Sequence, residues 1–226
     1  MLDINMYSKY IVALEPIING SRKISGYEVC LKTINDSTVM PNVFDHETKL
    51  NKAIYMLDRL TYFVESNIDK KCFSEISFYV TFEFDYIQEP RVLIFVHVLN
   101  NVLKSKGSSL VFIFHDNDLS KNVNLIYSYD FYYPTSCPIK LGVMCFDFTS
   151  FHQLDVMNKF DISVVKFKFD LRLTEILITQ VIPICSNTNS LLLFEDVNDE
   201  GLFFEASGIS NALYKGCIAG SVIYIT

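Results

Sequence analysis

Histidine and cysteine side chains are the first to consider for chemistry, because both types ligate metals and act in nucleophilic catalysis. The four histidines are scattered, and none forms a His-x-x-x-His or Glu-x-x-His pair. None of the six cysteines lies in a Cys-x-x-Cys pair, so the spacing of a zinc site is absent. We expect reduced, buried thiols instead. The sequence has no Gly-x-Ser-x-Gly, Walker or Gly-x-Gly-x-x-Gly motif, although a Ser–His–Asp triad stays open.

Any chemistry must be positioned by short apolar runs that alternate with segments of helical period. The predicted strands are Tyr10–Ile18, Ile24–Lys32, Ile76–Phe84, Ser109–Phe114, Leu141–Phe148, Val164–Phe169, Ser190–Val197 and Lys215–Ala219. The predicted helices are Glu47–Ile68, a segment from Pro90 that ends by Gly107, Ser150–Lys159, Leu171–Cys185, which Pro183 would end or bend, and Asp199–Ala206. An irregular loop with room for one short helix is expected over Asp116–Pro138.

Repeated strand–helix units with continuous apolar strands indicate a parallel sheet with helices packed outside it. A slightly trimmed (β/α)8 barrel fits the chain length, and an open doubly wound sheet is the alternative. The first two strands, joined by a turn at Gly20, predict an antiparallel pair that is unusual in either architecture.

Composition limits the possible partners. The chain has 226 residues, of which 50% are hydrophobic and 20% charged, so we expect one domain over residues 1–226. A net charge of −7 disfavours nonspecific nucleic-acid binding. No apolar run reaches the roughly 20 residues of a membrane-spanning helix, and the N-terminus lacks a signal-peptide layout. We therefore expect a soluble cytoplasmic protein with neither nucleic acid nor membrane as a direct partner.

Six segments follow one another in a recognisable order. They are Ala13-Leu-Glu-Pro-Ile-Ile-Asn, Lys23-Ile-Ser-Gly-Tyr-Glu-Val-Cys-Leu-Lys32, Leu141–Leu154, Asp161–Lys168, Leu192–Asn198 and Lys215-Gly216. Together they resemble the motifs of EAL domains, phosphodiesterases that hydrolyse the bacterial second messenger cyclic di-GMP. The resemblance covers essentially the whole chain. It implies an α/β fold, a (β/α)8 TIM-like barrel of EAL type with one antiparallel strand near the start.

The resemblance also implies a site at the carboxyl ends of the strands. Phosphodiester hydrolysis in this family uses two divalent ions held chiefly by carboxylates, which activate a water and neutralise phosphoryl charge. Four positions keep the residue type of the family's motifs, namely Glu28, Asp147, Lys166 and Glu195. Two further positions, Lys32 and Lys215, stand where the family has a phosphate-facing Arg and a Gln, and are possible ligand-binding residues.

Four other positions have lost the family's ligands. They are Thr81 in place of Asn, Ile113 in place of Glu, Phe146 in place of Asp and Lys168 in place of Asp. Lys168 brings a cation that could pair with Asp147 or Glu195 and replace a metal ion. So few carboxylates beside an ammonium cannot hold two close dications. We therefore expect no metal, no cofactor and no enzyme activity.

These expectations favour a degenerate EAL-like regulator that works through protein–protein binding. By analogy with inactive EAL-like proteins of enteric bacteria, its partner would be a transcription regulator of motility or surface structures. A sensor that binds cyclic di-GMP weakly is the alternative, and a residual phosphodiesterase is a third hypothesis. The aromatic segment Tyr127–Pro134 is a candidate partner surface, and we expect a monomer when the chain is free of partners.

Overall fold

The computed structural model describes residues 10–34, 46–67, 70, 73–121, 140–144, 161–168, 179 and 181–225. Within these residues the strands are β1 (Tyr10–Asn19), β2 (Ile24–Thr33), β3 (Ser77–Thr81), β4 (Ser109–His115), β5 (Lys140–Met144), β6 (Ile162–Lys168), β7 (Leu191–Glu195), β8 (Ala212–Lys215) and β9 (Ile223–Ile225). They form one sheet in which consecutive strands from β2 to β8 are neighbours and run parallel.

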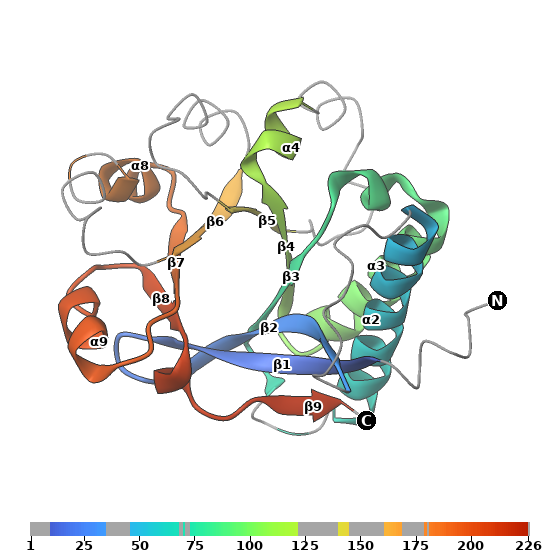
Figure 1. Ribbon diagram of the computed structural model, residues 1–226, viewed down its shortest axis with the longest axis horizontal. Coiled ribbons are helices and arrows are strands. Elements are labelled where there is room, and N and C mark those ends of the chain that lie inside the picture. Colours follow the sequence, from blue (N-terminus) through green and yellow to red (C-terminus); the bar gives the residue numbers. More distant parts are fainter. Residues whose placement is uncertain are drawn as a thin grey trace.

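Strand β1 closes this sheet into a barrel (Figure 1), because it pairs with β2 along one edge and with β8 along the other. Both pairings are antiparallel. The barrel therefore has the architecture that the sequence predicts, including the reversed strand near the start. The open doubly wound sheet is excluded, since such a sheet has two free edges.

The helices of the described residues lie outside the barrel (Figure 1). They are α2 (His46–Ser66), α3 (Pro90–Lys104), α4 (Asp116–Lys121), α8 (Ile182–Asn187) and α9 (Glu200–Ala206), with 3-10 turns η2 (Phe84–Gln88) and η6 (Cys217–Ala219). Local sequence explains two of the starts. Pro90 occupies the first turn of α3, where its missing N–H costs nothing, and the Asp199 side chain caps α9 by accepting a hydrogen bond from Leu202 N at 3.0 Å.

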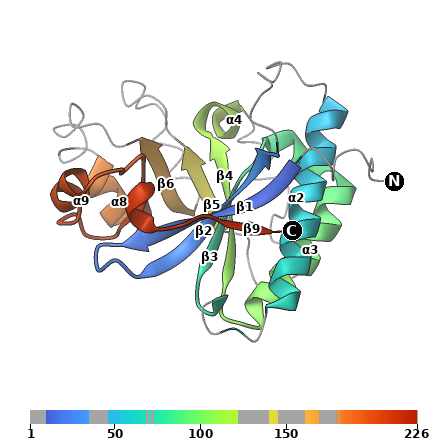
Figure 2. The same cartoon turned by 60° about the horizontal axis from the view of Figure 1, so that its bottom comes forward.

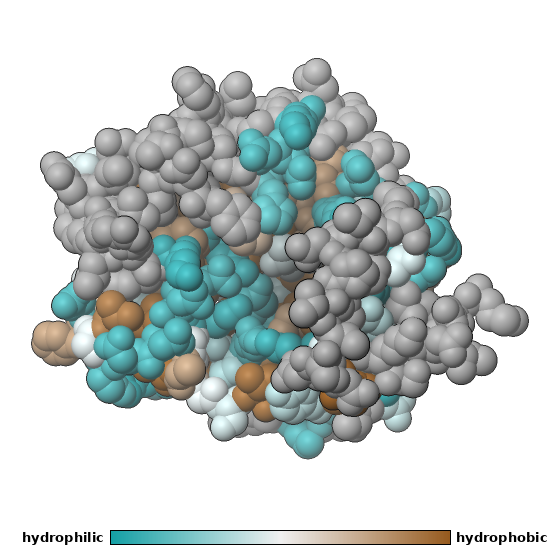
Figure 3. All heavy atoms as spheres, in the orientation of Figure 1, coloured by the Kyte–Doolittle hydropathy of each residue, from teal (hydrophilic) through white to brown (hydrophobic). Residues whose placement is uncertain are grey.

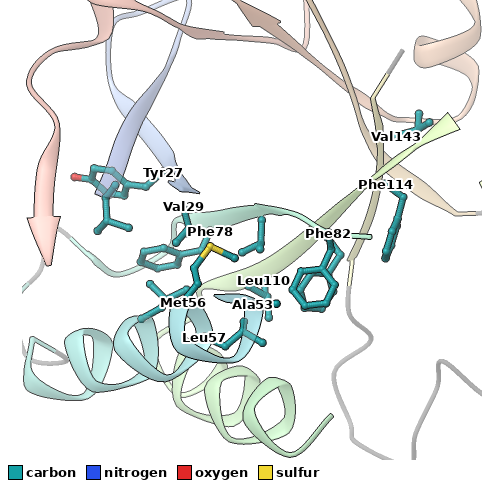
Figure 4. Close-up of a cluster of buried hydrophobic side chains, with 14 of the residues drawn as sticks. Tyr27, Val29, Ala53, Met56, Leu57, Phe78, Phe82, Leu110, Phe114 and Val143 are labelled. Atoms are coloured by element: carbon teal, nitrogen blue, oxygen red, sulfur yellow. The ribbon is translucent and has the colours of Figure 1, made fainter. Parts of the chain in front are cut away.

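Alternation along the strands produces two apolar cores. Outward-facing residues such as Phe78 and Leu110 pack against α2, where Leu57 and Met56 cover them (Figure 4). A smaller cluster fills the barrel interior and contains Ile17, Tyr79, Val111, Ile113, Met144, Val164, Leu193 and Leu213. The interior is therefore a packed core below the site, as in other small barrels.

Several predicted boundaries were wrong. The strand expected over Ile76–Phe84 ends at Thr81, because the chain turns into η2. The strand expected at Lys215–Ala219 lies earlier, at Ala212–Lys215, because Gly216 adopts a φ of 152° and starts the turn η6. Pro183 does not end the helix at this point, because α8 continues to Asn187. It stands in the first turn of α8, where proline is tolerated.

Strand β9 has no counterpart in the sequence-based prediction. It has three residues and pairs with β1 around Ala13, so it is fixed by a contact with the opposite end of the chain. Figure 2 shows β9 running beside β1. The predicted helix Ser150–Lys159, most of Leu171–Cys185 and the loop after Lys121 lie outside the described residues.

Substitution of Gly142 tests how tightly the barrel interior is filled. A Cβ atom at Gly142 would lie 2.5 Å from Val164 Cγ1 and 3.1 Å from Ile113 Cγ1. We expect Gly142→Ala to lower the free energy of unfolding, measured with urea, by about 1–3 kcal/mol through overpacking. Gly208→Ala is the control, because its Cβ would meet no atom within 4 Å, and it should change stability by less than about 0.5 kcal/mol. Equal stability of the two variants would contradict this packing.

Candidate functional site

One end of the barrel collects an interior-facing side chain from each of the eight closing strands. In strand order these mouth residues are Glu15, Glu28, Thr81, Ile113, Met144, Lys166, Glu195 and Lys215. The strand registers pair Glu15 with Glu28, Thr81 with Ile113 and Met144 with Lys166. Between β2 and β3, β4 and β5, β6 and β7, and β8 and β1, neighbouring mouth residues are offset by two positions along the strand. In the view of Figure 3, hydrophilic residues gather over the centre of the barrel.

Four charged mouth residues form a closed ring of ion pairs. Glu28 Oε1 lies 2.5 Å from Lys166 Nζ, and Glu28 Oε2 accepts a hydrogen bond from Lys215 Nζ. Glu195 Oε1 lies 2.9 Å from Lys166 Nζ and 3.1 Å from Lys215 Nζ. Each carboxylate therefore bridges the same two ammonium groups.

Glu15 and Lys32 extend this ring toward solvent. Glu15 stands directly opposite Glu28 in the β1–β2 register, and its carboxylate contacts Lys215 Nζ at 2.9 Å and Lys32 Nζ at 2.5 Å. The resulting charge network consists of Glu15, Glu28, Glu195, Lys32, Lys166 and Lys215. Three carboxylates and three ammonium groups balance, so the network carries no net charge.

Burial makes the charges of this network depend on their ion pairs. The Glu28 side chain is 7% exposed and the Lys166 side chain 4% exposed, and neither charge could be buried alone. Burial raises the pKa of Glu28, but attraction to Lys166 and Lys215 outweighs burial and holds the pKa below its ordinary value. Burial lowers the pKa of Lys215, but the carboxylates of Glu28, Glu15 and Glu195 raise it by more than burial lowers it. The net effect is a raised pKa, so this ammonium group stays protonated.

Glu15 behaves in the same way at the edge of the network. Burial alone would raise its pKa, but hydrogen bonds from Lys32 and Lys215 bring it from 4.5 down to about 2. The hydrogen bond to Glu15 in turn raises the pKa of Lys32. Sequence reasoning missed Glu15. The signal for Glu15 was a lone acidic residue within the apolar strand predicted over Tyr10–Ile18.

Lys168 was expected to pair with Asp147 or Glu195. Asp147 lies outside the described residues, and the ion pair of Lys168 within them is with Asp196. Lys168 lies at the carboxyl end of β6, beyond Lys166, with its side chain 75% exposed and its Nζ 2.8 Å from Asp196 Oδ2. Asp196 has a φ of 59°, a left-handed conformation that glycine adopts more readily than other residues. The interior cations are Lys166 and Lys215 instead.

Two of the other replaced positions, Thr81 and Ile113, lie within the described residues. Thr81 Oγ1 donates a hydrogen bond to Glu28 Oε1 at 3.3 Å, and Ile113 is fully buried in the interior cluster. Asn198 Oδ1 accepts a hydrogen bond from Cys217 N at 3.0 Å and so ties the loop after β7 to the turn after β8. Of the described cysteines, Cys185 is buried as predicted, whereas Cys217 is exposed and Cys30 intermediate.

The described donors do not fit the pair of divalent ions that the EAL resemblance implies. Such ions need a crowd of oxygen ligands, mostly carboxylates. Ile113 offers no ligand, and ammonium groups already engage both carboxylates of the ring. Among the described residues, no group of three or more His, Cys, Asp or Glu side chains could hold a metal ion. Asp147, Phe146 and the segment Tyr127–Pro134 lie outside the described residues.

Comparisons with known proteins identify the fold. No protein-family model and no curated protein matches the chain, but solved structures do. The cAMP-bound form of the EAL enzyme Bd1971 matches 97% of this chain with a TM-score of 0.71 and 12% identity, and the chain spans 65% of its length. The Xanthomonas citri FimX EAL domain in complex with c-diGMP matches 96% of this chain with a TM-score of 0.73 and 10% identity. The match covers 89% of the length of that domain.

A third match is the PaMucR phosphodiesterase in its c-di-GMP complex. The alignment covers 97% of this chain and 94% of the length of that protein. Its TM-score is 0.66 and its identity 12%. The chain therefore has the EAL-type barrel fold that the motif order predicts. None of the described helices is long and apolar enough to cross a membrane.

One expectation fails on this comparison. The sequence led us to expect that the chain is not an enzyme, yet structures that share its fold are described as an EAL enzyme and as a phosphodiesterase. We withdraw that expectation.

Acid should weaken the charge network. The folded-state pKa of Glu15 lies near 2, below its ordinary 4.5, so its stabilisation is complete above pH 4.5 and is lost as the pH falls toward 2. The lowered pKa of Glu28 acts in the same direction. We expect the free energy of unfolding, measured with urea at a series of pH values, to fall over this range. Glu15→Gln should make the fall shallower, and an equally steep fall in that variant would contradict the assignment.

Proposed function

We propose that this chain is a cytosolic regulator that is monomeric when free and acts by binding a protein partner, such as a transcription regulator. The observation that carries the proposal is the charge network. Its six side chains pair with one another and link β1, β2, β6, β7 and β8, which supports a structural role for the mouth. A rigid barrel of this kind presents its outer helices and loops as a fixed surface for a partner.

The outer surface offers apolar side chains that a protein partner could cover. Ile94 on α3 is 64% exposed, Phe204 on α9 is 81% exposed and Tyr224 on β9 is 55% exposed. Large apolar and aromatic side chains supply much of the binding energy at protein interfaces. These three residues lie on three different elements, so each one tests a different part of the barrel's outer surface.

Site-specific photo-crosslinking tests the proposal. A photoreactive amino acid is placed in turn at Ile94, Phe204 and Tyr224, with the exposed polar position Asn187 as control. We expect one apolar position to capture a single protein in cells of the source organism and the control to capture none. The captured protein, purified, should bind the wild-type chain, and an aspartate at the crosslinking position should weaken binding at least tenfold. Absence of binding by the purified protein would contradict the proposal.

Binding of cyclic di-GMP is a second candidate function, favoured by the fold shared with the FimX EAL domain that was solved with c-diGMP. Lys32, whose side chain is 45% exposed at the edge of the network, is the residue we assign to a phosphate. Lys215, the other lysine that the EAL resemblance suggests for the ligand, directs its ammonium group to the carboxylates of Glu15, Glu28 and Glu195. Lys32 offers a point charge rather than the fork of an arginine, so we expect an affinity in the micromolar range or weaker.

Calorimetric titration with cyclic di-GMP, followed by chromatography of the same samples, separates these functions. Binding that Lys32→Met weakens about tenfold, while Lys49→Met leaves it unchanged, would support the sensor function. Lys49 is a matched control, because it pairs with Glu83 outside the network and is 40% exposed. Absence of heat would contradict the sensor function, and a linear dinucleotide product would assign hydrolysis instead.

A further inference from the structure

We propose that the ammonium groups of Lys166 and Lys215 hold the mouth of this barrel together in the way that two divalent cations would, so that the fold needs no metal ion. The inference is independent of the proposed partner. It follows from the geometry of the carboxylates, from the strands that carry them and from the number of donors on each lysine.

The carboxylates contact the two ammonium groups as bridging ligands. Glu28 gives one oxygen to each lysine, and Glu195 gives the same oxygen, Oε1, to both. A carboxylate that joins two metal ions uses these same two modes. The two cationic positions are thus defined by shared ligands, and each is filled by a lysine side chain.

Lys215 fills its position completely. An ammonium group has three N–H donors, and Lys215 Nζ contacts three carboxylates, those of Glu15 at 2.9 Å, Glu28, and Glu195 at 3.1 Å. These acids come from β1, β2 and β7, so one cation draws together three strands. A divalent ion entering between these carboxylates would meet the ammonium charge at close range, and repulsion would oppose its binding.

Lys166 makes the contact across the barrel. It lies on β6, and its partner Glu28 lies on β2, on the far side of the ring of strands. Both side chains are nearly inaccessible to water, so removal of either one leaves a buried charge without one of its partners. A tethered cation cannot dissociate, and chelators therefore have nothing to remove from the described part of the mouth.

Thermal unfolding in the presence and absence of metal tests the first part of the inference. We expect the melting temperature of the full chain to shift by less than about 1 °C among EDTA, Mg²⁺ and Mn²⁺ at millimolar concentration. A metal ion held by the folded state would raise the melting temperature progressively with its concentration. Such a rise would overturn the proposal.

Removal of one ammonium group tests the second part. Lys166→Met keeps the length of the side chain but leaves a buried carboxylate in excess, and we expect the melting temperature to fall by roughly 6–20 °C. Lys168→Met is the matched control on the same strand, since its side chain is mostly exposed, and it should shift the melting temperature by less than about 3 °C. Equal shifts in the two variants would overturn the proposal.

Two further readouts separate charge balance from lost packing. In Lys166→Met the excess carboxylate gains a proton as the pH falls, so the deficit relative to wild type should shrink between about pH 7 and pH 4. The double variant Glu28→Gln, Lys166→Met restores neutrality and should recover most of the lost melting temperature. A deficit that is constant with pH and persists in the double variant would show that only packing was lost. The metal test on the wild type decides the matter if the single variant fails to fold.

Discussion

The structure depends on one buried carboxylate, that of Glu28. A charge with a 7% exposed side chain is tolerated only because Lys166 and Lys215 each contact one of its oxygens. The two contacts join Glu28 on β2 to Lys166 on β6 and to Lys215 on β8. Lys215 in turn contacts Glu15 on β1. The same set of ion pairs thus links β1, β2, β6 and β8 and leaves the mouth of the barrel neutral.

Strand alternation made much of this arrangement predictable. The apolar runs around Glu28, Lys166 and Glu195 placed these residues on strands, and the order of the motifs placed the strands in a barrel. The ion pairs themselves were not predictable, because Glu28 lies 138 residues from Lys166 and 187 residues from Lys215 in the sequence. A role for Glu15 at the site was not predicted. Its position opposite Glu28 depends on the register of the β1–β2 hairpin, which cannot be read from the sequence alone.

Lys168 shows the limit of reasoning by position in a motif. It and Lys166 share one face of β6, but a displacement of two residues along the strand moves the ammonium from the packed interior to solvent. There the Lys168 ammonium forms an ion pair with Asp196. Lys168 and Asp196 balance each other's charge at the solvent-exposed end of β6, apart from the network in the interior.

The most direct test of the account is diffraction from crystals of the full chain grown with Mn²⁺, using the anomalous signal of manganese. The account predicts no manganese peak between Glu28 and Glu195, and lysine density for Lys166 and Lys215 in contact with both carboxylates. A manganese ion bound to Glu28, with either lysine displaced from it, would contradict the claim that ammonium groups hold this barrel together.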